Sequence, residues 1–235
     1  SFYCSNAFSK TKFNAFKEER EEELIYSIRS LGEEEIDAVL KDVNRFALKS
    51  QPEFKTNQDP STPCNTFISS LYQKERLLFL LRYGLAYVEE HSKDGTIQLQ
   101  KHVMRYPQFF ATKAIEDAIE KGVKKGVIWH TQGSGKTALS YFNIRYLTNY
   151  FSKQEIVPQF YFVVDRLDLA DQATREFTKR GLKVKRINRP QELNEKHDAY
   201  QVAVVNIQKF KDNSDLTDHS GYDLNRQNIY FIDEA

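Results

Sequence analysis

The stretch at residues 126–137, GVIWHTQGSGKT, constrains the fold of this chain more than any other. Its apolar start is typical of a buried strand, and the residues from Ala138 onward favour a helix. The glycines between them let successive backbone N–H groups converge on one point, where the helix adds its positive end and Lys136 adds a charge. The stretch therefore predicts a strand at 126–131, a phosphate-binding loop and a helix at 136–151.

One position departs from the general loop pattern, which has glycine where this chain has His130. The alternative interpretation is an ordinary glycine-rich turn between a strand and a helix. The intact Gly135, Lys136 and Thr137 after an apolar run favour a nucleotide site, in which the Thr137 hydroxyl would hold Mg²⁺ between the outer phosphates.

Composition limits the class of protein. The 235 residues suffice for one large or two small domains, and 40% of them are hydrophobic. No apolar run approaches the roughly 18 residues that a membrane helix needs. Cys4 and Cys64 stand far apart with no cysteine or histidine cluster near them, as in reduced intracellular proteins without a metal framework. We therefore expect a soluble, cytoplasmic protein without a membrane partner.

The first hundred residues predict a mostly helical region. We expect edge strands within 1–16, helices at 17–31, 33–48 and 66–83, a proline-rich linker at 50–64, and a hairpin at 84–103 that turns at Asp94–Gly95. Proline in the first turn then favours a helix from Pro107 to about Lys121. Glu53 and Lys55 match half of a Mg²⁺ nuclease motif, but their proline-rich context and the lack of a partner aspartate favour a linker.

The remaining residues alternate strands and helices. Strands are expected at 159–164, 183–187, 200–206 and 228–232, and helices at 166–180, 191–196 and, briefly, 207–211. Near-continuous apolar strands are typical of a parallel sheet covered on both faces. The predicted fold class is α/β, a RecA-like P-loop lobe with a mainly parallel sheet, preceded by a mostly helical connector. We expect three segments: an N-terminal region and linker at 1–65, the connector and hairpin at 66–104, and the lobe at 105–235.

Polar residues stand at the ends of these expected strands, where ligands collect in parallel sheets. Asp233 and Glu234 close the last strand, so Asp233 would anchor Mg²⁺ and Glu234 would orient an attacking water. Two earlier strand ends carry residues that could contact a phosphate backbone, although ordinary helix capping could also explain them: Arg166, Gln172, Asn206, Gln208 and Lys209.

Five motifs in one order carry a resemblance to a known family. They are Gln108 after Tyr106-Pro107, HTQGSGKT at 130–137, VVDRLDLADQ at 163–172, NIQKF at 206–210 and DEA at 233–235. Together they resemble the first motor lobe of the R (restriction and translocation) subunit of type I restriction enzymes, within helicase superfamily 2. The resemblance covers residues 66–235 well and residues 1–65 loosely.

The resemblance implies an ATP-driven motor that pumps double-stranded DNA past a complex with modification and specificity subunits in the bacterial cytoplasm, and cleaves it far from the recognition site. Histidine is the family's usual residue at position 130. The implied catalytic residues are Lys136, Asp233 and Glu234, the implied Mg²⁺ ligands are Thr137 and Asp233, and the implied DNA contacts are the five strand-end residues above. The implied ATP contacts are Arg105, Gln108, His130, Thr131, Gln132, Gly133, Ser134, Gly135, Lys136 and Thr137.

The same family carries a nuclease core and a second motor lobe with an arginine finger, which these residues do not supply. We therefore expect them to belong to a longer protein, and to bind ATP weakly and hydrolyse little by themselves. Two alternatives stay open: another superfamily 2 DNA or RNA helicase, and, for residues 1–100, a module that docks the motor to partner subunits.

Overall fold

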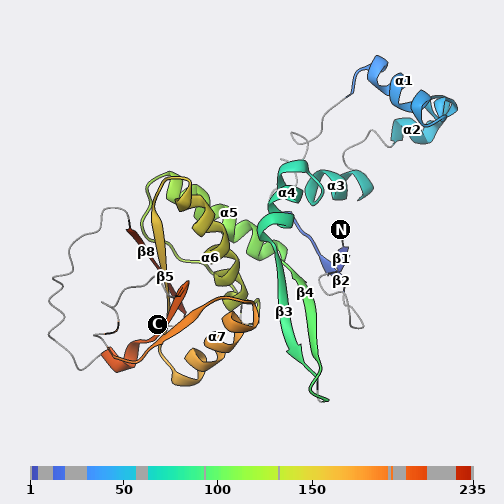
Figure 1. The fold of residues 1–235 in the computed structure, drawn as a ribbon. Helices are drawn as coiled ribbons and strands as arrows, with labels where there is room; N and C mark the ends of the chain where they lie inside the picture. Colours follow the sequence, from blue (N-terminus) through green and yellow to red (C-terminus); the bar gives the residue numbers. More distant parts are fainter. Residues whose placement is uncertain are drawn as a thin grey trace. The chain divides into compact units, whose positions relative to one another are not determined.

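The computed structural model describes residues 2–4, 13–18, 31–56, 63–92, 94–131, 133–189, 192, 200–210 and 226–233. These residues divide by packing into two units (Figure 1). Unit 1 ends at Arg82, and unit 2 begins at Tyr83.

Unit 1 is mostly helical, with one small sheet. The strands β1 (Phe2–Cys4) and β2 (Phe13–Ala15) pair antiparallel, which confirms the expected edge strands. The helices are α1 (Glu33–Asp42), the 3₁₀ turn η2 (Phe46–Ser50), α2 (Pro52–Thr56), α3 (Pro63–Ser70) and α4 (Lys74–Tyr83), whose last residue belongs to unit 2.

Several helix boundaries in unit 1 differ from the sequence predictions. The helix expected at 33–48 ends at Asp42, because Asn44 takes a left-handed backbone conformation with φ 54°. The helix expected at 66–83 is two helices, α3 and α4, separated by a turn. Part of the expected linker is helical in α2 and α3, and most of the helix expected at 17–31 lies outside the described residues.

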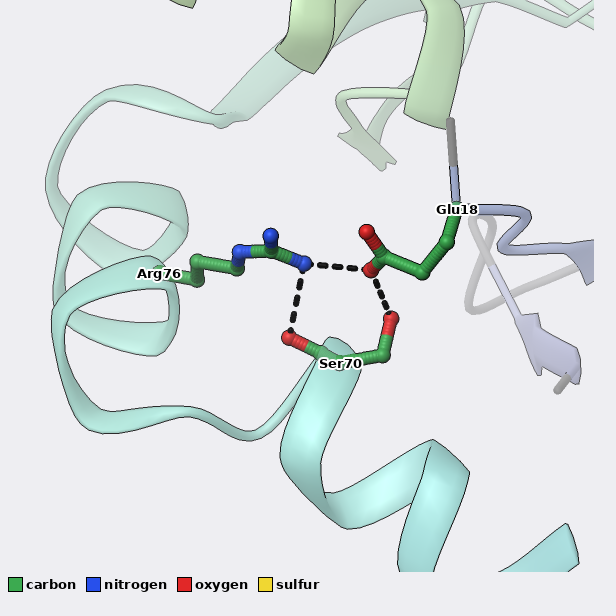
Figure 2. Close-up of polar contacts among 3 residues, drawn as sticks. All are labelled: Glu18, Ser70 and Arg76. Atoms are coloured by element: carbon green, nitrogen blue, oxygen red, sulfur yellow. Dashed lines mark hydrogen bonds and ion pairs between the residues drawn. The ribbon is translucent and has the colours of Figure 1, made fainter. Parts of the chain in front are cut away.

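A buried carboxylate joins the segment after β2 to the helices α3 and α4. The Glu18 side chain is only 5% exposed and accepts hydrogen bonds from the Ser70 hydroxyl and the Arg76 guanidinium. Arg76 also donates to the Ser70 carbonyl at 3.3 Å, which closes the three-residue network (Figure 2). Because a buried charge must be paired, this network fixes the segment in place.

Unit 2 starts with the expected hairpin. The strands β3 (Leu85–His91) and β4 (Ile97–Val103) pair antiparallel around a turn in which Gly95 has φ +84° (Figure 1). Helix α5 (Tyr106–Glu120) follows within a residue of its predicted start. The Arg145 guanidinium donates to the Leu85 carbonyl and so ties the hairpin to the rest of unit 2.

A parallel sheet of four described strands forms the centre of unit 2. Its order is β6–β7–β5–β8, made of β6 (Val184–Ile187), β7 (Val202–Asn206), β5 (Val157–Val164) and β8 (Arg226–Asp233). All neighbouring pairs in this sheet are parallel. These four strands and the α/β class agree with the prediction, and the fold is that of a RecA-like lobe.

The helices α6 (Lys136–Ser152) and α7 (Leu167–Lys179) pack against the sheet, and η5 (Ile207–Phe210) follows β7. On one face, the Phe162 ring meets Phe177 of α7 edge-on at 5.2 Å. On the other face, Tyr161, Ile187 and Tyr200 form a buried cluster with Ala203 and Val205. Burial on both faces explains the continuous apolar runs of β5 and β7. The helix expected at 191–196 lies outside the described residues, apart from Glu192.

The strand expected at 126–131 is wrong. This segment forms no sheet pairing among the described residues, and Val127 and Trp129 are 90% and 91% exposed. An apolar, β-branched run becomes a strand only where a neighbour offers free N–H and C=O groups. The outer edges of β6 and β8 have no partner among the described strands, yet residues 126–131 pair with neither, so an apolar composition alone does not make this run a strand.

No described helix is both long enough and apolar enough to cross a lipid bilayer.

Candidate functional site

The sheet register places three residues in one row at the carboxyl ends of the strands. Val164 of β5 pairs with Asn206 of β7 on one side and with Asp233 of β8 on the other. Side chains in one row point to the same face, so Asn206 and Asp233 lie about 10 Å apart across Val164, two strand spacings. The expected nucleotide and DNA residues therefore meet at one edge of the sheet.

The loop before α6 is built by two glycines in the left-handed region. Gly133 has φ +75° and Gly135 has φ +86°, a conformation that other residues adopt only with strain. The Ser134 N–H donates to the Thr131 carbonyl at 3.2 Å, and α6 begins directly after Gly135. The positive end of a 17-residue helix therefore faces this loop, as an anion site requires.

Lys136 and Asp233 meet beside this loop. The Lys136 Nζ lies 3.3 Å from the Asp233 Oδ1, although the two residues are far apart in the sequence. The two side chains are partly exposed, so the pair stays within reach of solvent and of a ligand. Mg²⁺ binds few protein ligands beside water and phosphate, so one carboxylate and the Thr137 hydroxyl suit it. No group of three or more histidine, cysteine or acidic side chains that could hold a metal occurs in the described part of the chain.

Gln108 of α5 contacts the loop directly, which the sequence motif alone did not reveal. Gln108 is only 3% exposed. Its Nε2 donates to the Gly135 carbonyl at 3.1 Å, and its Oε1 accepts from the Arg105 N–H at 2.9 Å. A methyl group added at Gly135 would lie 2.7 Å from Gln108 Nε2. Gln108 therefore fixes the last turn of the loop, while Arg105 is exposed at the start of α5.

Two buried polar atoms in the loop region support a polyanionic ligand. The Ser134 Oγ and the His130 Nδ1 are inaccessible to solvent, and neither has a hydrogen-bond partner among the described residues. Buried polar atoms are nearly always paired, so such atoms beside a helix N-terminus and a lysine suit phosphate oxygens as partners. The residues present therefore fit ATP with Mg²⁺. Gln132 and Glu234 lie outside the described residues.

The five expected DNA residues divide by exposure. Arg166, Gln172 and Gln208 are exposed, whereas Asn206 is 1% exposed and the Lys209 side chain lies outside the described part. Arg166 binds both oxygens of Asp168, at 3.1 and 2.7 Å, and this pairing lowers the pKa of Asp168 below its ordinary value.

Asp165 was missed by the sequence prediction. Its Oδ1 is buried without a donor among the described residues, and only its place at a strand end could have pointed to it.

The parallel sheet, the glycine loop and the paired Lys136 and Asp233 define a P-loop ATPase lobe. The family model for SWI2/SNF2 ATPases matches residues 107–235, more than half of the chain. The chain belongs to the SWI2/SNF2 ATPase family.

Curated relatives carry type I restriction enzyme names. A Methanocaldococcus jannaschii protein, provisionally named a type I restriction enzyme endonuclease subunit, is 43% identical over 108 residues, which cover 43% of this chain and 10% of that protein. A Staphylococcus aureus type I restriction enzyme endonuclease subunit is 35% identical over 142 residues, 56% of this chain and 14% of the relative. The corresponding Haemophilus influenzae HindI subunit is 33% identical over 120 residues, 48% of this chain and 11% of the relative.

These names match the resemblance drawn from the motifs and confirm it. The matched region spans between 10% and 17% of the length of these relatives and of a second Methanocaldococcus jannaschii protein.

Proposed function

We propose that this chain carries the ATP-driven, DNA-translocating motor of a type I restriction endonuclease R subunit. The observation that carries the proposal is the pairing of Lys136 and Asp233 at 3.3 Å beside a glycine loop, at the carboxyl edge of a parallel sheet. The family match and the restriction enzyme names of the relatives support it.

The residues of the loop would divide the work of binding. The N–H groups around Gly133 and Gly135, the Ser134 hydroxyl and the start of α6 would hold the phosphates. Lys136 would exchange Asp233 for phosphate oxygens, which frees the carboxylate to bind Mg²⁺ together with Thr137. ATP with Mg²⁺ would supply the phosphoryl group that is transferred to water, and Glu234 would orient that water.

DNA would lie across the ends of β5 and β7. Arg166 and Gln208 are exposed there, and Gln172 is exposed within α7. All three carry donors suited to phosphate and sugar oxygens, as would Lys209. Such contacts position the duplex without reading its sequence, which suits a motor that must pass over any sequence. Recognition of a DNA site would then belong to the partner specificity subunit. The adenine contact expected from Gln108, with Arg105, stays a prediction, and it would require the Gln108 amide to leave the Gly135 carbonyl and the Arg105 N–H.

Replacement of one lysine tests the nucleotide site. In the complete protein, we expect Lys136→Ala to lower DNA-stimulated ATP hydrolysis at least about a hundredfold, because transition-state charge loses a fixed partner. Lys121→Ala is the matched control, since Lys121 is an exposed lysine of unit 2 that pairs with Asp117 across one helical turn. Steady-state ATPase measurements with and without duplex DNA compare the two, and equal activity in both variants would refute the site.

Displacement of a third DNA strand tests translocation. The complete protein, assembled with its modification and specificity subunits, is expected to strip a triplex-forming oligonucleotide from duplex DNA in an ATP-dependent way, and to leave the duplex strands paired. Strand separation instead would favour a superfamily 2 helicase. ATP hydrolysis without any displacement would contradict the motor.

A further inference from the structure

Asn206 is one of the five expected DNA contacts, but its burial indicates a different role. It ends β7 with 1% of its surface exposed, whereas the next two residues, Ile207 and Gln208, are exposed. The buried Ser134 Oγ and His130 Nδ1 have no partner among the described residues, whereas the buried Asn206 carboxamide is hydrogen-bonded within the protein. The polar group must therefore act on the protein itself.

Both halves of the Asn206 amide are used within unit 2. Its Nδ2 donates to the Asp165 carbonyl at 3.3 Å, and its Oδ1 accepts from the Gln208 N–H at 3.0 Å. Asp165 directly precedes Arg166 in the loop after β5, and Gln208 lies in η5 after β7. One buried side chain thus joins the two loops whose exposed residues are expected to contact DNA.

The chemistry of the junction requires an amide. The Asp165 carbonyl needs a donor and the Gln208 N–H needs an acceptor. The asparagine amide carries one of each on the same carbon atom. Aspartate would keep the acceptor but has no donor when ionised. The Asp165 Oδ1 adds no such tie, because it is buried without a donor among the described residues.

The junction also lies close to the nucleotide site. Asn206 shares its row of the sheet with Asp233, across Val164 alone. A movement of the loops after β5 and β7 would therefore also displace β5, the strand that lies between Asn206 and Asp233.

We propose that Asn206 is a positioning residue that holds the loops after β5 and β7 in one arrangement, so that Arg166 and Gln208 engage DNA together and communicate that binding to the ATP site. The inference rests on the proposed function. It differs from a direct DNA contact because Asn206 acts through Asp165 and Gln208.

Removal of the whole Asn206 amide from the complete protein tests its effect on DNA binding. We expect Asn206→Ala to raise the duplex DNA concentration for half-maximal ATPase stimulation about tenfold, with the KM for ATP unchanged, since only the loop geometry is lost. Gln159→Ala is the matched control: Gln159 is a buried amide of β5 away from this row, and its Nε2 donates a long hydrogen bond to the Phe160 carbonyl at 3.5 Å. An equal effect of Gln159→Ala, or an equal change in the KM for ATP, would mean general destabilisation and overturn the proposal.

Amide hydrogen exchange tests the junction without any ATPase measurement. In Asn206→Ala, the Gln208 N–H is expected to exchange faster while the amides of β5 stay protected. In Asn206→Asp, the Gln208 N–H should stay protected because its acceptor remains, although the tie to Asp165 is lost. Unchanged exchange at Gln208 in Asn206→Ala would overturn the proposal, even if the complete protein had no DNA-stimulated ATPase. Conversely, faster exchange in a protein without that ATPase would keep the junction and refute the proposed function alone.

Discussion

Gly135 is restricted to glycine by both its backbone conformation and a neighbouring side chain. Its φ of +86° lies in the region that favours glycine, its carbonyl accepts from Gln108, and an added methyl group would meet Gln108 Nε2 at 2.7 Å. Gly133 shares the left-handed conformation, but a methyl group there would meet nothing within 4 Å. Gly126 has neither constraint. The three glycines thus form a graded series.

The series predicts graded losses of stability. Gly135→Ala should lower the free energy of unfolding by about 2–3 kcal/mol, from the left-handed conformation and the crowding of Gln108 together. Gly133→Ala should cost about 1 kcal/mol, from conformation alone. Gly126→Ala should be neutral within about 0.5 kcal/mol. Urea unfolding measures all three, and the double variant Gly135→Ala with Gln108→Ala should regain part of the loss. Equal losses for Gly135→Ala and Gly126→Ala would contradict the crowding.

At the scale of elements, the buried Glu18 joins α3 and α4 to the segment after β2 in unit 1. Glu18→Ala should lower the free energy of unfolding by about 2–3 kcal/mol, because the buried Ser70 hydroxyl and the partly buried Arg76 guanidinium lose the carboxylate to which they donate. The exposed pair of Lys121 and Asp117 is the control, and Asp117→Ala should cost less than about 0.5 kcal/mol. Denaturant unfolding compares the two, and similar small losses would show that the Glu18 network contributes little.

Elements that depend on local pattern were predictable, whereas elements that depend on a distant neighbour were not. The hairpin at β3 and β4 follows from alternation around Asp94–Gly95, and the continuous apolar run of β5 indicates a strand buried on both faces. The run at 126–131 is also apolar from Val127 to Trp129 but has no partner strand among the described residues, so its state depends on pairing that composition does not encode.

The site shows the same division between local pattern and distant contact. The roles of Lys136 and Asp233 were predictable, because the glycine loop and the end of an apolar strand can each be recognised from neighbouring residues in the sequence. The contact of Gln108 with Gly135 joins helix α5 to the loop before α6, and the burial of Asn206 depends on packing around the end of the sheet. Neither follows from spacing in the sequence.

At the scale of the whole molecule, the most exposed large apolar side chains among the described residues lie in a segment beside the nucleotide loop. Val127 and Trp129 are about nine-tenths exposed, just before His130. Exposed apolar groups of this kind promote association between molecules. Because Trp129 is the single tryptophan of the 235 residues, its fluorescence reports this segment without interference from another tryptophan.

The exposure of Trp129 predicts both its emission and the effect of replacing its neighbour. The tryptophan emission of this chain should match that of the amino acid in water and should be fully quenched by acrylamide. Val127→Ser should leave the free energy of unfolding within about 0.5 kcal/mol, because no packing is lost, and should reduce light scattering at high concentration. Val164→Ser, at a buried position of β5, is the contrasting control and should cost about 2 kcal/mol or more. Blue-shifted emission with weak quenching, or a loss for Val127→Ser as large as for Val164→Ser, would mean that residues 126–129 are packed inside the protein.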